Sequence, residues 1–534
     1  MLENEITINV DAADRRGKLD PVWSYFGYDE PNYTYAPGGK KLLKELAALS
    51  GAPVYVRTHN LLTSGDGTPS LKWGSTGVYS EDGSGHPVYD WTIIDRIFDA
   101  YHESGIRPLV EIGFMPEALS TRPQPYRHHW PEGNLWTGWA YPPKDYARWS
   151  ELIYNWASHV VNRYGRPEVE TWLWEVWNEP DIGYWQGTPE EYYRLHDFSA
   201  AAVRKALPGA IIGGPHTTGG GGEYLRGFLN HCSRGTNAAT GGTGSPLDYI
   251  AFHPKGSTRF VDGHIRMSLG NHLKNVDRNL EVIASLPEWR SMPIVLGESD
   301  PEGCAACAAV TYPENGYRNG PMYAAYTAAA LAGTLELAEK YGVSIRGIVT
   351  WAFEFEDQPY FAGFRSLSTN GIAKPILNLF RMLGRMGAER VALESSGATT
   401  ADLVAVESVR EQAVVDGIAA LDDRRLTVLI WRYHDDDIPI PDASIAFSVV
   451  HLPARVAHLR HFRIDQTHSN AFRTWRELGS RDTPTAEEYA KLEAAGQLQR
   501  IDERRIPVEN GRLEIRFPLP LHGVSLLELS WPLP

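Results

Sequence analysis

Residues 172–181, Trp-Leu-Trp-Glu-Val-Trp-Asn-Glu-Pro-Asp, join an aromatic, apolar run to a carboxylate that could do chemistry. Pro180 lacks an N–H and disfavours helix at the residue before it, so the predicted strand stops at Glu179. The carboxyl group then lies at the tip of a buried strand, beside the amide of Asn178. The alternative is an ordinary strand end whose acid faces solvent. The aromatic run before Asn-Glu-Pro favours a catalytic acid or base.

A second glutamate has the same design, because Glu298 directly follows the apolar run Pro-Ile-Val-Leu-Gly at 293–297. Two facing carboxyl groups can hydrolyse a glycosidic bond. One protonates the leaving oxygen, and the other attacks the anomeric carbon or activates water. Either glutamate alone could be an unrelated strand-end acid. Two at matching positions make coincidence less likely, so Glu179 and Glu298 are predicted as a catalytic pair.

The segments that would position this pair alternate between strand-like and helix-like patterns from residue 21 onward. The predicted strands cover residues 22–27, 54–57, 108–112, 172–179, 211–213, 247–252, 293–297 and 344–350. Helical patterns separate them, and the last helix covers 374–386. Eight such units predict an α/β fold, a (β/α)8 TIM barrel over residues 21–387, in which catalytic groups sit at the C-terminal ends of the strands. A doubly wound open sheet is the alternative fold.

The predicted strand ends carry further side chains suited to a binding site: Arg57, His59, Phe114, Asn178, His253 and Trp351. His59 could bond a sugar hydroxyl or be a satisfied buried histidine, and both interpretations stay open. Asp300 and Glu302, which follow Glu298, are predicted to be solvated loop acids.

After residue 387 short β-like runs, among them 403–407, follow one another without alternating helices. This pattern predicts a C-terminal antiparallel β-sandwich over 388–534, interrupted by a helical insertion near 483–498. Residues 1–20 contain the alternating strand pattern Ile6–Val10, which is expected to pair with the sandwich.

The composition restricts the partners. Hydrophobic residues at 43% and charged residues at 22% are typical of a soluble globular protein. The net charge of -15 argues against nucleic acid or an anionic membrane, which need basic patches. No apolar run reaches ~18 residues. The start of the chain shows no signal-peptide pattern, which favours the cytoplasm. The oligomeric state is not predicted, and a monomer is compatible with the sequence.

No cofactor or metal is predicted. Cys304-Ala-Ala-Cys307 has metal or redox spacing, but no second Cys/His pair stands at a convincing interval. Two free thiols or one local disulfide are therefore favoured over zinc. His128-His129 lie in a Pro- and Trp-rich stretch without an acidic partner, which indicates a surface loop.

Several motifs resemble one known family, glycoside hydrolase family 39, over nearly the full length. They are Trp174-Glu175-Val176-Trp177-Asn178-Glu179-Pro180-Asp181, Glu298 after the seventh strand, Gly105-Ile106-Arg107-Pro108 before the third, and Ile464-Asp465 through His468-Ser469-Asn470. The best-studied bacterial members of this family are β-xylosidases. The resemblance implies a retaining mechanism, with Glu179 as acid/base and Glu298 as nucleophile.

The resemblance also implies that Asn178 binds the 2-hydroxyl of the sugar and that His59 and His253 contact it. Arg57 is expected to keep Glu298 anionic, and Trp351 to form the floor under the glycone. Glu356 and Asp357 match an acidic pair of the family and are expected to bind outer hydroxyls.

The chain departs from the family pattern at Lys255, where the family often places an aromatic residue. The predicted activity is exo-hydrolysis of β-1,4-linked xylose from the non-reducing ends of xylo-oligosaccharides. Because the family also contains α-L-iduronidases, which need a cationic pocket, an arabinosidase or iduronidase-like activity is the alternative. A non-catalytic carbohydrate-binding protein is disfavoured by the presence of both glutamates.

Overall fold

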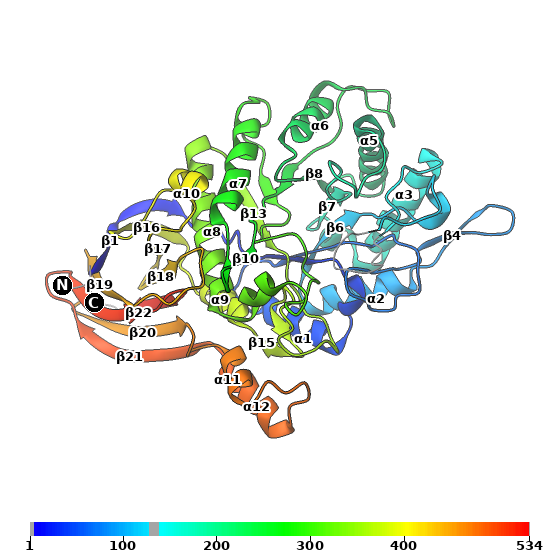
Figure 1. Ribbon diagram of the computed structural model, residues 1–534. Helices are drawn as coiled ribbons and strands as arrows, with labels where there is room; N and C mark the ends of the chain where they lie inside the picture. Colours follow the sequence, from blue (N-terminus) through cyan, green and yellow to red (C-terminus); the bar gives the residue numbers. More distant parts are fainter. Residues whose placement is uncertain (1–4, 128–137, 533–534) are drawn as a thin grey trace.

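The computed structural model describes residues 5–127 and 138–532 of the chain (Figure 1). A closed barrel with an outer layer of helices makes up one side of the molecule, and a β-sheet that carries both chain ends makes up the other. Within the described ranges, no helix has the length and apolar character needed to cross a membrane.

Eight parallel strands close the barrel in the order β12-β13-β2-β3-β6-β7-β8-β9. The TIM-barrel prediction is therefore confirmed, and the open-sheet alternative is wrong. In chain order the strands are β2 (Tyr25–Tyr28), β3 (Tyr55–Thr58), β6 (Arg107–Ile112), β7 (Leu173–Val176), β8 (Ile211–Thr218), β9 (Tyr249–His253), β12 (Ile294–Leu296) and β13 (Ile345–Thr350). The helices are α1 (Pro37–Ala47), α2 (Thr92–Ser104), α3 (Tyr146–Tyr164), α4 (Arg166–Val169), α5 (Pro189–Ala206), α6 (Gly222–Arg234), α7 (Leu269–Ala284), α8 (Pro321–Tyr341) and α9 (Pro375–Leu383).

Strand alternation decides which side chains of β7 face the barrel interior. Leu173 belongs to the interior cluster with the stacked rings of Tyr25 and Tyr55. The indole of Trp174 points the other way and packs edge-on against Trp156 of α3. The aromatic run that marks this strand in the sequence therefore serves mainly to hold helices on the barrel.

The C-terminal end of β7 differs from the prediction, because the strand ends at Val176 rather than at Glu179. The next residues turn across the barrel mouth, with positive φ at Trp177 (72°) and Glu179 (42°). Non-glycine residues rarely adopt this backbone conformation, and they do so mostly where the surroundings hold them. Here the backbone N–H of Glu179 donates to the carbonyl of His216, at 3.0 Å. The turn carries the carboxyl group of Glu179 toward the barrel axis.

The second sheet has nine strands in the order β21-β20-β23-β18-β17-β16-β1-β19-β22. Strand β1 (Ile6–Lys18) runs antiparallel to β16 (Glu389–Ser395) and parallel to β19 (Ala443–Val450). One core contains Phe447 from β19 together with Leu459 and Leu527 from the opposite end of the sheet. The sheet thus folds over its own apolar face as a β-sandwich, as predicted. Its other strands are β17 (Val414–Asp422), β18 (Arg425–Tyr433), β20 (Val456–Ile464), β21 (Gln499–Pro507), β22 (Leu513–Leu519) and β23 (Val524–Ser530).

The prediction of a β-like run at 403–407 is wrong, because these residues belong to helix α10 (Ala401–Glu407). The hydroxyl of Thr400 caps the helix by accepting from the N–H of Leu403. The buried positions of α10 are Ala401 and Val404, at helical spacing, and α10 packs on α7 and α8. The predicted helical insertion near 483–498 is helix α12 (Ala486–Ala495). A second helix, α11 (Ala471–Glu477), precedes it outside the predicted range, and both project from the sandwich (Figure 1).

Short elements complete the fold at the C-terminal end of the barrel. They are the pairs β4 (Tyr79–Glu81) with β5 (Pro87–Tyr89), β10 (Arg259–Val261) with β11 (His264–Arg266), and β14 (Ser368–Thr369) with β15 (Ile372–Ala373), together with the 3-10 turns η1 (Pro31–Tyr33), η2 (Glu117–Leu119) and η3 (Pro313–Asn319).

The barrel interior should be sensitive to added volume at Gly213 on β8. A Cβ there would lie 2.0 Å from the ring of Tyr249, which is fully buried. We expect Gly213→Ala to lower the free energy of unfolding by about 1–3 kcal/mol, because overpacking forces neighbouring groups to move. Guanidinium denaturation measures the change. The control is Gly51→Ala, where a Cβ meets nothing within 4 Å. Equal stability of the two variants would contradict the packing described for the interior.

Candidate active site

The carboxyl groups of Glu179 and Glu298 meet at the mouth of the barrel. Glu179 follows β7 and Glu298 follows β12, while His253 ends β9 between them. A carboxylate oxygen of each glutamate and a ring nitrogen of His253 all lie within 4.8 Å of one another. Retaining glycosidases place their two carboxyl groups ~5–5.5 Å apart, whereas inverting enzymes leave ~6.5–9.5 Å for a water. The observed separation fits the shorter arrangement.

Glu298 is surrounded by basic side chains. Its Oε2 lies 2.7 Å from Nζ of Lys255, and its Oε1 lies 3.2 Å from Nη1 of Arg57. Nε2 of His59 lies 3.5 Å from the same Oε1. Burial alone would raise the pKa of Glu298, but Lys255, His59 and Arg57 outweigh burial and lower this pKa to about 2. Glu298 is therefore anionic at neutral pH.

Glu179 has the opposite electrostatic setting. Burial and, after it, the negative charge of Glu298 raise the pKa of Glu179 to about 8. Its Oε1 lies 2.9 Å from Nδ1 of His253. Glu179 is therefore mainly protonated at neutral pH, so it can give a proton while Glu298 offers a lone pair. Two carboxyl groups whose pKa values are driven apart can take the roles of acid and nucleophile.

Arg57 connects the strand ends beneath the pair. Its guanidinium is completely buried and reaches Glu175 at 2.6 Å, Glu111 at 3.1 Å and Glu298 at 3.2 Å. It also donates to Oδ1 of Asn178, at 3.1 Å. Burial pushes the pKa of Glu175 up, but Arg57 and His216 outweigh burial and lower it. Sequence reasoning identified Arg57 and Asn178, but missed Glu111 and Glu175 because both look like ordinary interior strand positions.

The histidines of the site are held by hydrogen bonds on both ring nitrogens. Nε2 of His253 lies 3.1 Å from Nδ1 of His216, whose other nitrogen contacts Glu175. Burial lowers the pKa of His216, and burial and then Arg57 lower the pKa of His253 well below its usual range. Both rings are therefore neutral at pH 7. His253 can donate to Glu179 or accept from it without adding a charge.

His59 is buried beside Glu298. Its Nδ1 is 2.7 Å from Asp29 and its Nε2 is 3.0 Å from Glu111. Asp29 also pairs with the buried Lys72, at 2.7 Å. The sequence left two interpretations of His59 open. Most of its contacts are those of a buried histidine with satisfied hydrogen bonds, although its Nε2 also lies near Glu298.

Aromatic rings pack around His59. The ring of Trp351 lies 4.4 Å from the imidazole, centroid to centroid, and Phe114 meets it edge-on at 6.0 Å. The guanidinium of Arg57 lies 5.0 Å from the centroid of the Trp351 ring. Phe114 and Trp351 are both buried beside His59.

Lys255 and Asp300 form a part of the site that the strand-end pattern did not identify. Nζ of Lys255 bridges Glu298 and Oδ2 of Asp300, at 2.8 Å from the latter. Oδ1 of Asp300 accepts from the backbone N–H of Trp351, at 3.0 Å. The prediction that Asp300 and Glu302 are solvated loop acids is wrong: Asp300 is fully buried, and Glu302 pairs with the buried Arg318 and Arg365.

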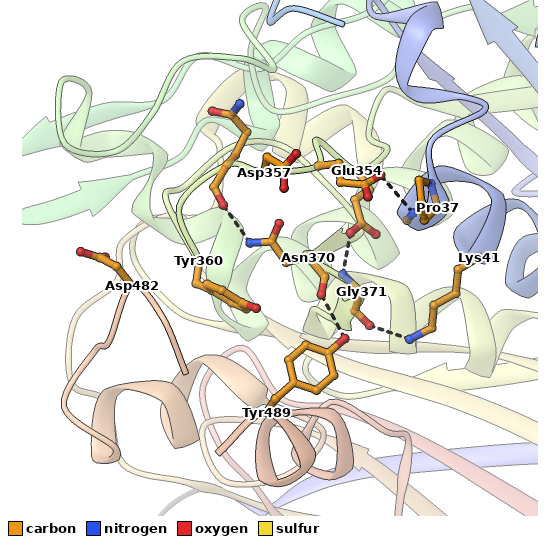
Figure 2. Close-up of a pocket in the computed structure, with 12 residues that line it drawn as sticks. Pro37, Lys41, Glu354, Asp357, Tyr360, Asn370, Gly371, Asp482 and Tyr489 are labelled. Carbon is orange, nitrogen blue, oxygen red and sulfur yellow. Dashed lines mark hydrogen bonds between the residues drawn. The ribbon is translucent and has the colours of Figure 1, made fainter. Parts of the chain in front are cut away.

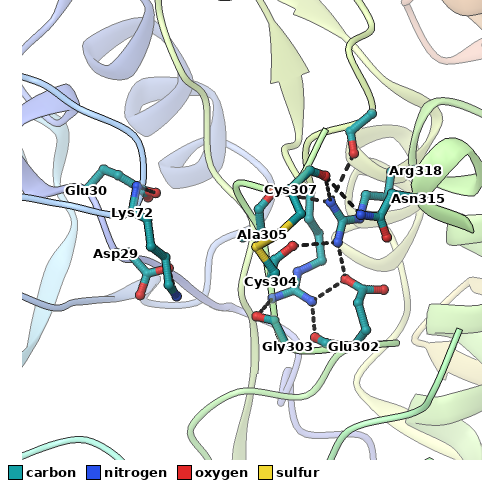
Figure 3. Close-up of a disulfide and its surroundings, with 12 residues drawn as sticks. Asp29, Glu30, Lys72, Glu302, Gly303, Cys304, Ala305, Cys307, Asn315 and Arg318 are labelled. Atoms are coloured by element: carbon teal, nitrogen blue, oxygen red, sulfur yellow. Dashed lines mark hydrogen bonds and ion pairs between the residues drawn. A yellow bond between two sulfur atoms is a disulfide. The ribbon is translucent and has the colours of Figure 1, made fainter. Parts of the chain in front are cut away.

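A disulfide closes the loop that follows Asp300 (Figure 3). Cys304 and Cys307 are bonded, which decides between the free thiols and the local disulfide left open by the sequence. The carbonyls of both cysteines accept from Arg318, at 2.7 Å and 3.0 Å. The loop after Glu298 is thus fixed from within, beside Glu302.

Glu356 and Asp357 line a different pocket, of about 520 Å³, which Lys41, Tyr360 and Tyr489 share (Figure 2). One oxygen of Glu356 accepts from the N–H of Gly38, at 3.1 Å. Within the described residues, neither acid bonds to Glu179 or Glu298. The expected role of Glu356 and Asp357 at the glycone remains a prediction. His128-His129 lie outside the described residues.

The triad Glu179, His253 and Glu298 has the spacing of a metal site. Glu298 and Glu179 are poorly suited to bind a metal ion. Glu298 already has Lys255 and Arg57 as counter-ions, and Glu179 is mainly protonated at neutral pH. A divalent ion would have to compete with two fixed cations, so paired carboxyl chemistry is the better fit for these donors.

Removal of Arg57 should destabilise the barrel mouth. We expect Arg57→Met to lower the free energy of unfolding by about 3–5 kcal/mol, because it leaves buried carboxylates unpaired. The folded-state pKa of Glu298 lies below its unfolded value of about 4.3. Its stabilisation is therefore present above that value and is lost as pH falls toward about 2. The deficit of Arg57→Met should accordingly shrink in acid.

Thermal and denaturant unfolding at several pH values measure this effect. Arg424→Met is the matched control, since it removes the same charge from an exposed side chain on the sandwich. A deficit in Arg57→Met no larger than that of the control, or one that grows as pH falls, would contradict the role assigned to Arg57.

Known proteins are similar in sequence to most of this chain. "Beta-xylosidase" of Caldicellulosiruptor saccharolyticus is 26% identical over 544 residues, which cover 98% of this chain and 98% of that protein. "Beta-xylosidase" of Geobacillus stearothermophilus is 25% identical, over 89% of this chain and 86% of that protein. "Alpha-L-iduronidase" of Homo sapiens is 26% identical, over 71% of this chain and 60% of that protein.

Among solved structures, the GH39 enzyme from Xanthomonas axonopodis pv. citri matches the fold with a TM-score of 0.77. It is 23% identical, and the match covers 99% of this chain and 98% of that one. The family described as Glycosyl hydrolases family 39 matches residues 6–512. The two carboxyl groups at the barrel mouth, the sandwich beside the barrel and this match over nearly the whole chain lead to one conclusion: the chain belongs to glycosyl hydrolase family 39.

Proposed function

We propose that this glycosidase is a retaining exo-β-xylosidase that removes xylose from the non-reducing ends of xylo-oligosaccharides. One observation carries the mechanism: carboxylate oxygens within 4.8 Å belong to groups with pKa values of about 8 for Glu179 and about 2 for Glu298. This combination supplies one proton donor and one nucleophile, at the short separation that retention requires.

In the first step, Glu179 gives its proton to the glycosidic oxygen while Glu298 attacks the anomeric carbon. The bond to the leaving group breaks, and a covalent glycosyl ester on Glu298 forms. Glu179, now anionic, then takes a proton from water, whose oxygen attacks the same carbon and releases Glu298. The burial that keeps Glu179 protonated in the resting enzyme also favours its return to the acid form.

The surrounding residues would orient the sugar. Oδ1 of Asn178 is occupied by Arg57, which turns the amide NH₂ toward the 2-hydroxyl of the glycone in our proposal. Trp351 and Phe114 would supply the apolar wall, with His59 and His253 contacting hydroxyls near the nucleophile and the acid. Arg57 and Lys255 would hold Glu298 anionic for attack.

The choice of xylose as glycone is supported by the two β-xylosidases at 25–26% identity. A second candidate substrate is a glycoside of a uronic acid. Lys255 favours it, since its ammonium group lies at the nucleophile, where it could also meet a sugar carboxylate. The similarity to α-L-iduronidases supports the same alternative.

Variants of the two glutamates test their roles. Glu298→Ala should abolish turnover of an aryl β-xyloside, by on the order of 10⁴-fold or more, because no covalent ester can form. Glu179→Ala should lose about 10²–10⁴-fold with poor leaving groups, but far less with leaving groups that need no proton. Added azide should partly restore the Glu179→Ala rate. The assignment of Glu179 fails if all aryl xylosides slow equally and azide has no effect.

The pH dependence of kcat/KM should follow the two pKa values. Activity should fall above pH about 8, where Glu179 loses its proton, and on the acid side only near pH about 2, where Glu298 gains one. We expect Lys255→Met to move the acid limb to higher pH, because it removes a cation that stabilises the Glu298 carboxylate. Lys274→Met, at an exposed position of α7, is the control. An acid limb that stays in place in Lys255→Met would contradict this assignment.

A panel of aryl glycosides separates the substrates. Aryl β-xylosides should be hydrolysed best under the main proposal, and aryl α-L-iduronides under the alternative. Aryl α-L-arabinosides test the remaining exo-activity of the same scaffold. If none is turned over and a fluoroglycoside does not label Glu298, a carbohydrate-binding protein without catalysis becomes the better description.

A further inference from the structure

A cavity of about 440 Å³ lies beside the active-site mouth, between the hairpin β10–β11, the start of α7 and Arg410 of the sandwich side. Its charged lining residues are Arg259, Arg266 and Arg410. No carboxylate is among the described residues that line it. In a chain with a net charge of -15, a cavity whose charged lining residues are all arginines favours an anionic ligand.

The guanidinium groups of Arg259 and Arg410 have N–H donors that could bind a ligand. The side chain of Arg259 is exposed and makes no hydrogen bond or ion pair with any residue of 5–127 or 138–532. Arg410 is half exposed, and its ion pair with Asp435 is long, at 3.7 Å. Arg266 differs, because Asp436 holds it through contacts of 2.5 Å and 3.0 Å. Arg266 is thus a fixed wall of the cavity, and the other two can close on a ligand.

Asp435 and Asp436, which pair with Arg410 and Arg266, are already engaged, and Asp262 in the turn of the hairpin is an exposed carboxylate near Arg266. Oδ1 of Asp435 accepts from the N–H of Leu269 and from the hydroxyl of Tyr433, at 3.2 Å and 2.7 Å. Its Oδ2 accepts from Ser408. The carboxylate of Asp435 therefore occupies the start of α7, and that of Asp436 is bound to Arg266. Neither is directed at the donors of Arg259.

The cavity adjoins the segment that carries catalytic-site groups. The connection from β9 to α7 begins with His253 and Lys255 and continues directly to Ser257 and Arg259 of the cavity wall. The amide of Asn271, another wall residue, donates to the carbonyl of Lys255 at 2.9 Å. His253, at the C-terminal end of β9, contacts Glu179. In the proposed mechanism the leaving group lies on the side of Glu179, because Glu179 protonates it.

We propose that this cavity binds the carboxylate or sulfate group of an acidic saccharide chain whose other end occupies the glycosidase site. The saccharide part of this inference rests on the proposed function, whereas the oxyanion part rests on the arginines alone. Guanidinium groups suit this ligand, because each can give two parallel hydrogen bonds to a planar carboxylate or to a sulfate edge. The enzyme would then prefer xylo-oligosaccharides with a uronate branch on the leaving-group side over neutral ones.

Isothermal titration calorimetry tests both parts. Sodium sulfate is titrated into the wild-type protein, while xylotriose and xylotriose with a glucuronate branch are titrated into Glu298→Ala, which prevents turnover. The tested substitutions are Arg259→Ala and Arg410→Ala, singly and together, in each background. Arg278→Ala is the matched control, because it removes the same charge from an exposed position of α7 outside the cavity wall. Melting temperatures confirm that each variant is folded.

We expect the branched trisaccharide to bind at least about tenfold more tightly than the neutral one, as charge-assisted hydrogen bonds allow. This preference should vanish in the double variant, persist in Arg278→Ala and weaken with added salt. Equal affinity for both trisaccharides, or a preference that survives the double substitution, would overturn the proposal. If sulfate binding alone depends on the two arginines, the cavity binds free oxyanions and the saccharide part is overturned.

Failure of the proposed function gives a different result. It would appear as absent hydrolysis in the aryl-glycoside panel, while the sulfate titration and its dependence on Arg259 and Arg410 would be unaffected.

Discussion

The buried guanidinium of Arg57 is the interaction on which the active end of the barrel depends. An unpaired cation inside a barrel would be strongly destabilising, so the surrounding strand ends must supply acceptors. They do so from β6 through Glu111, from β7 through Glu175 and from β12 through Glu298. The same group binds the Asn178 side chain. One side chain thereby orders the carboxylate of Glu298, the amide of Asn178 and the two acids Glu111 and Glu175.

The difference between the two glutamates follows from where the cations lie. Both carboxyl groups are buried, and burial alone would raise the pKa of each. Lys255 and Arg57 contact Glu298 directly, whereas the nearest partner of Glu179 is the neutral His253. Asp300 keeps Lys255 in position and is itself tied to the backbone of Trp351. The loop beyond it is held by Arg318, Arg365 and the disulfide, so the asymmetry has a rigid support.

The rim of the barrel carries two pockets of opposite character. The pocket around Glu356, Asp357 and Tyr489 is mainly acidic, and the cavity around Arg259 and Arg410 is basic. Each combines a loop from the C-terminal end of the barrel with side chains from the sandwich side or its helical insertion. The second sheet therefore contributes to the surface that a long substrate would meet, in addition to its own stability.

Local sequence patterns determined the eight barrel strands, the sandwich and the two glutamates, because apolar periodicity and a proline after Asn-Glu are properties of neighbouring residues. Such patterns failed at 403–407, where packing against α7 and α8 selects a helix. Only the tertiary structure decided that β7 ends at Val176, that Asp300 is buried and that Lys255 contacts Glu298. Those outcomes depend on hydrogen bonds and ion pairs between segments distant in the chain, whose energies no local pattern contains. The two glutamates that we propose as the catalytic pair could thus be selected from the sequence, whereas the pKa difference between them could not.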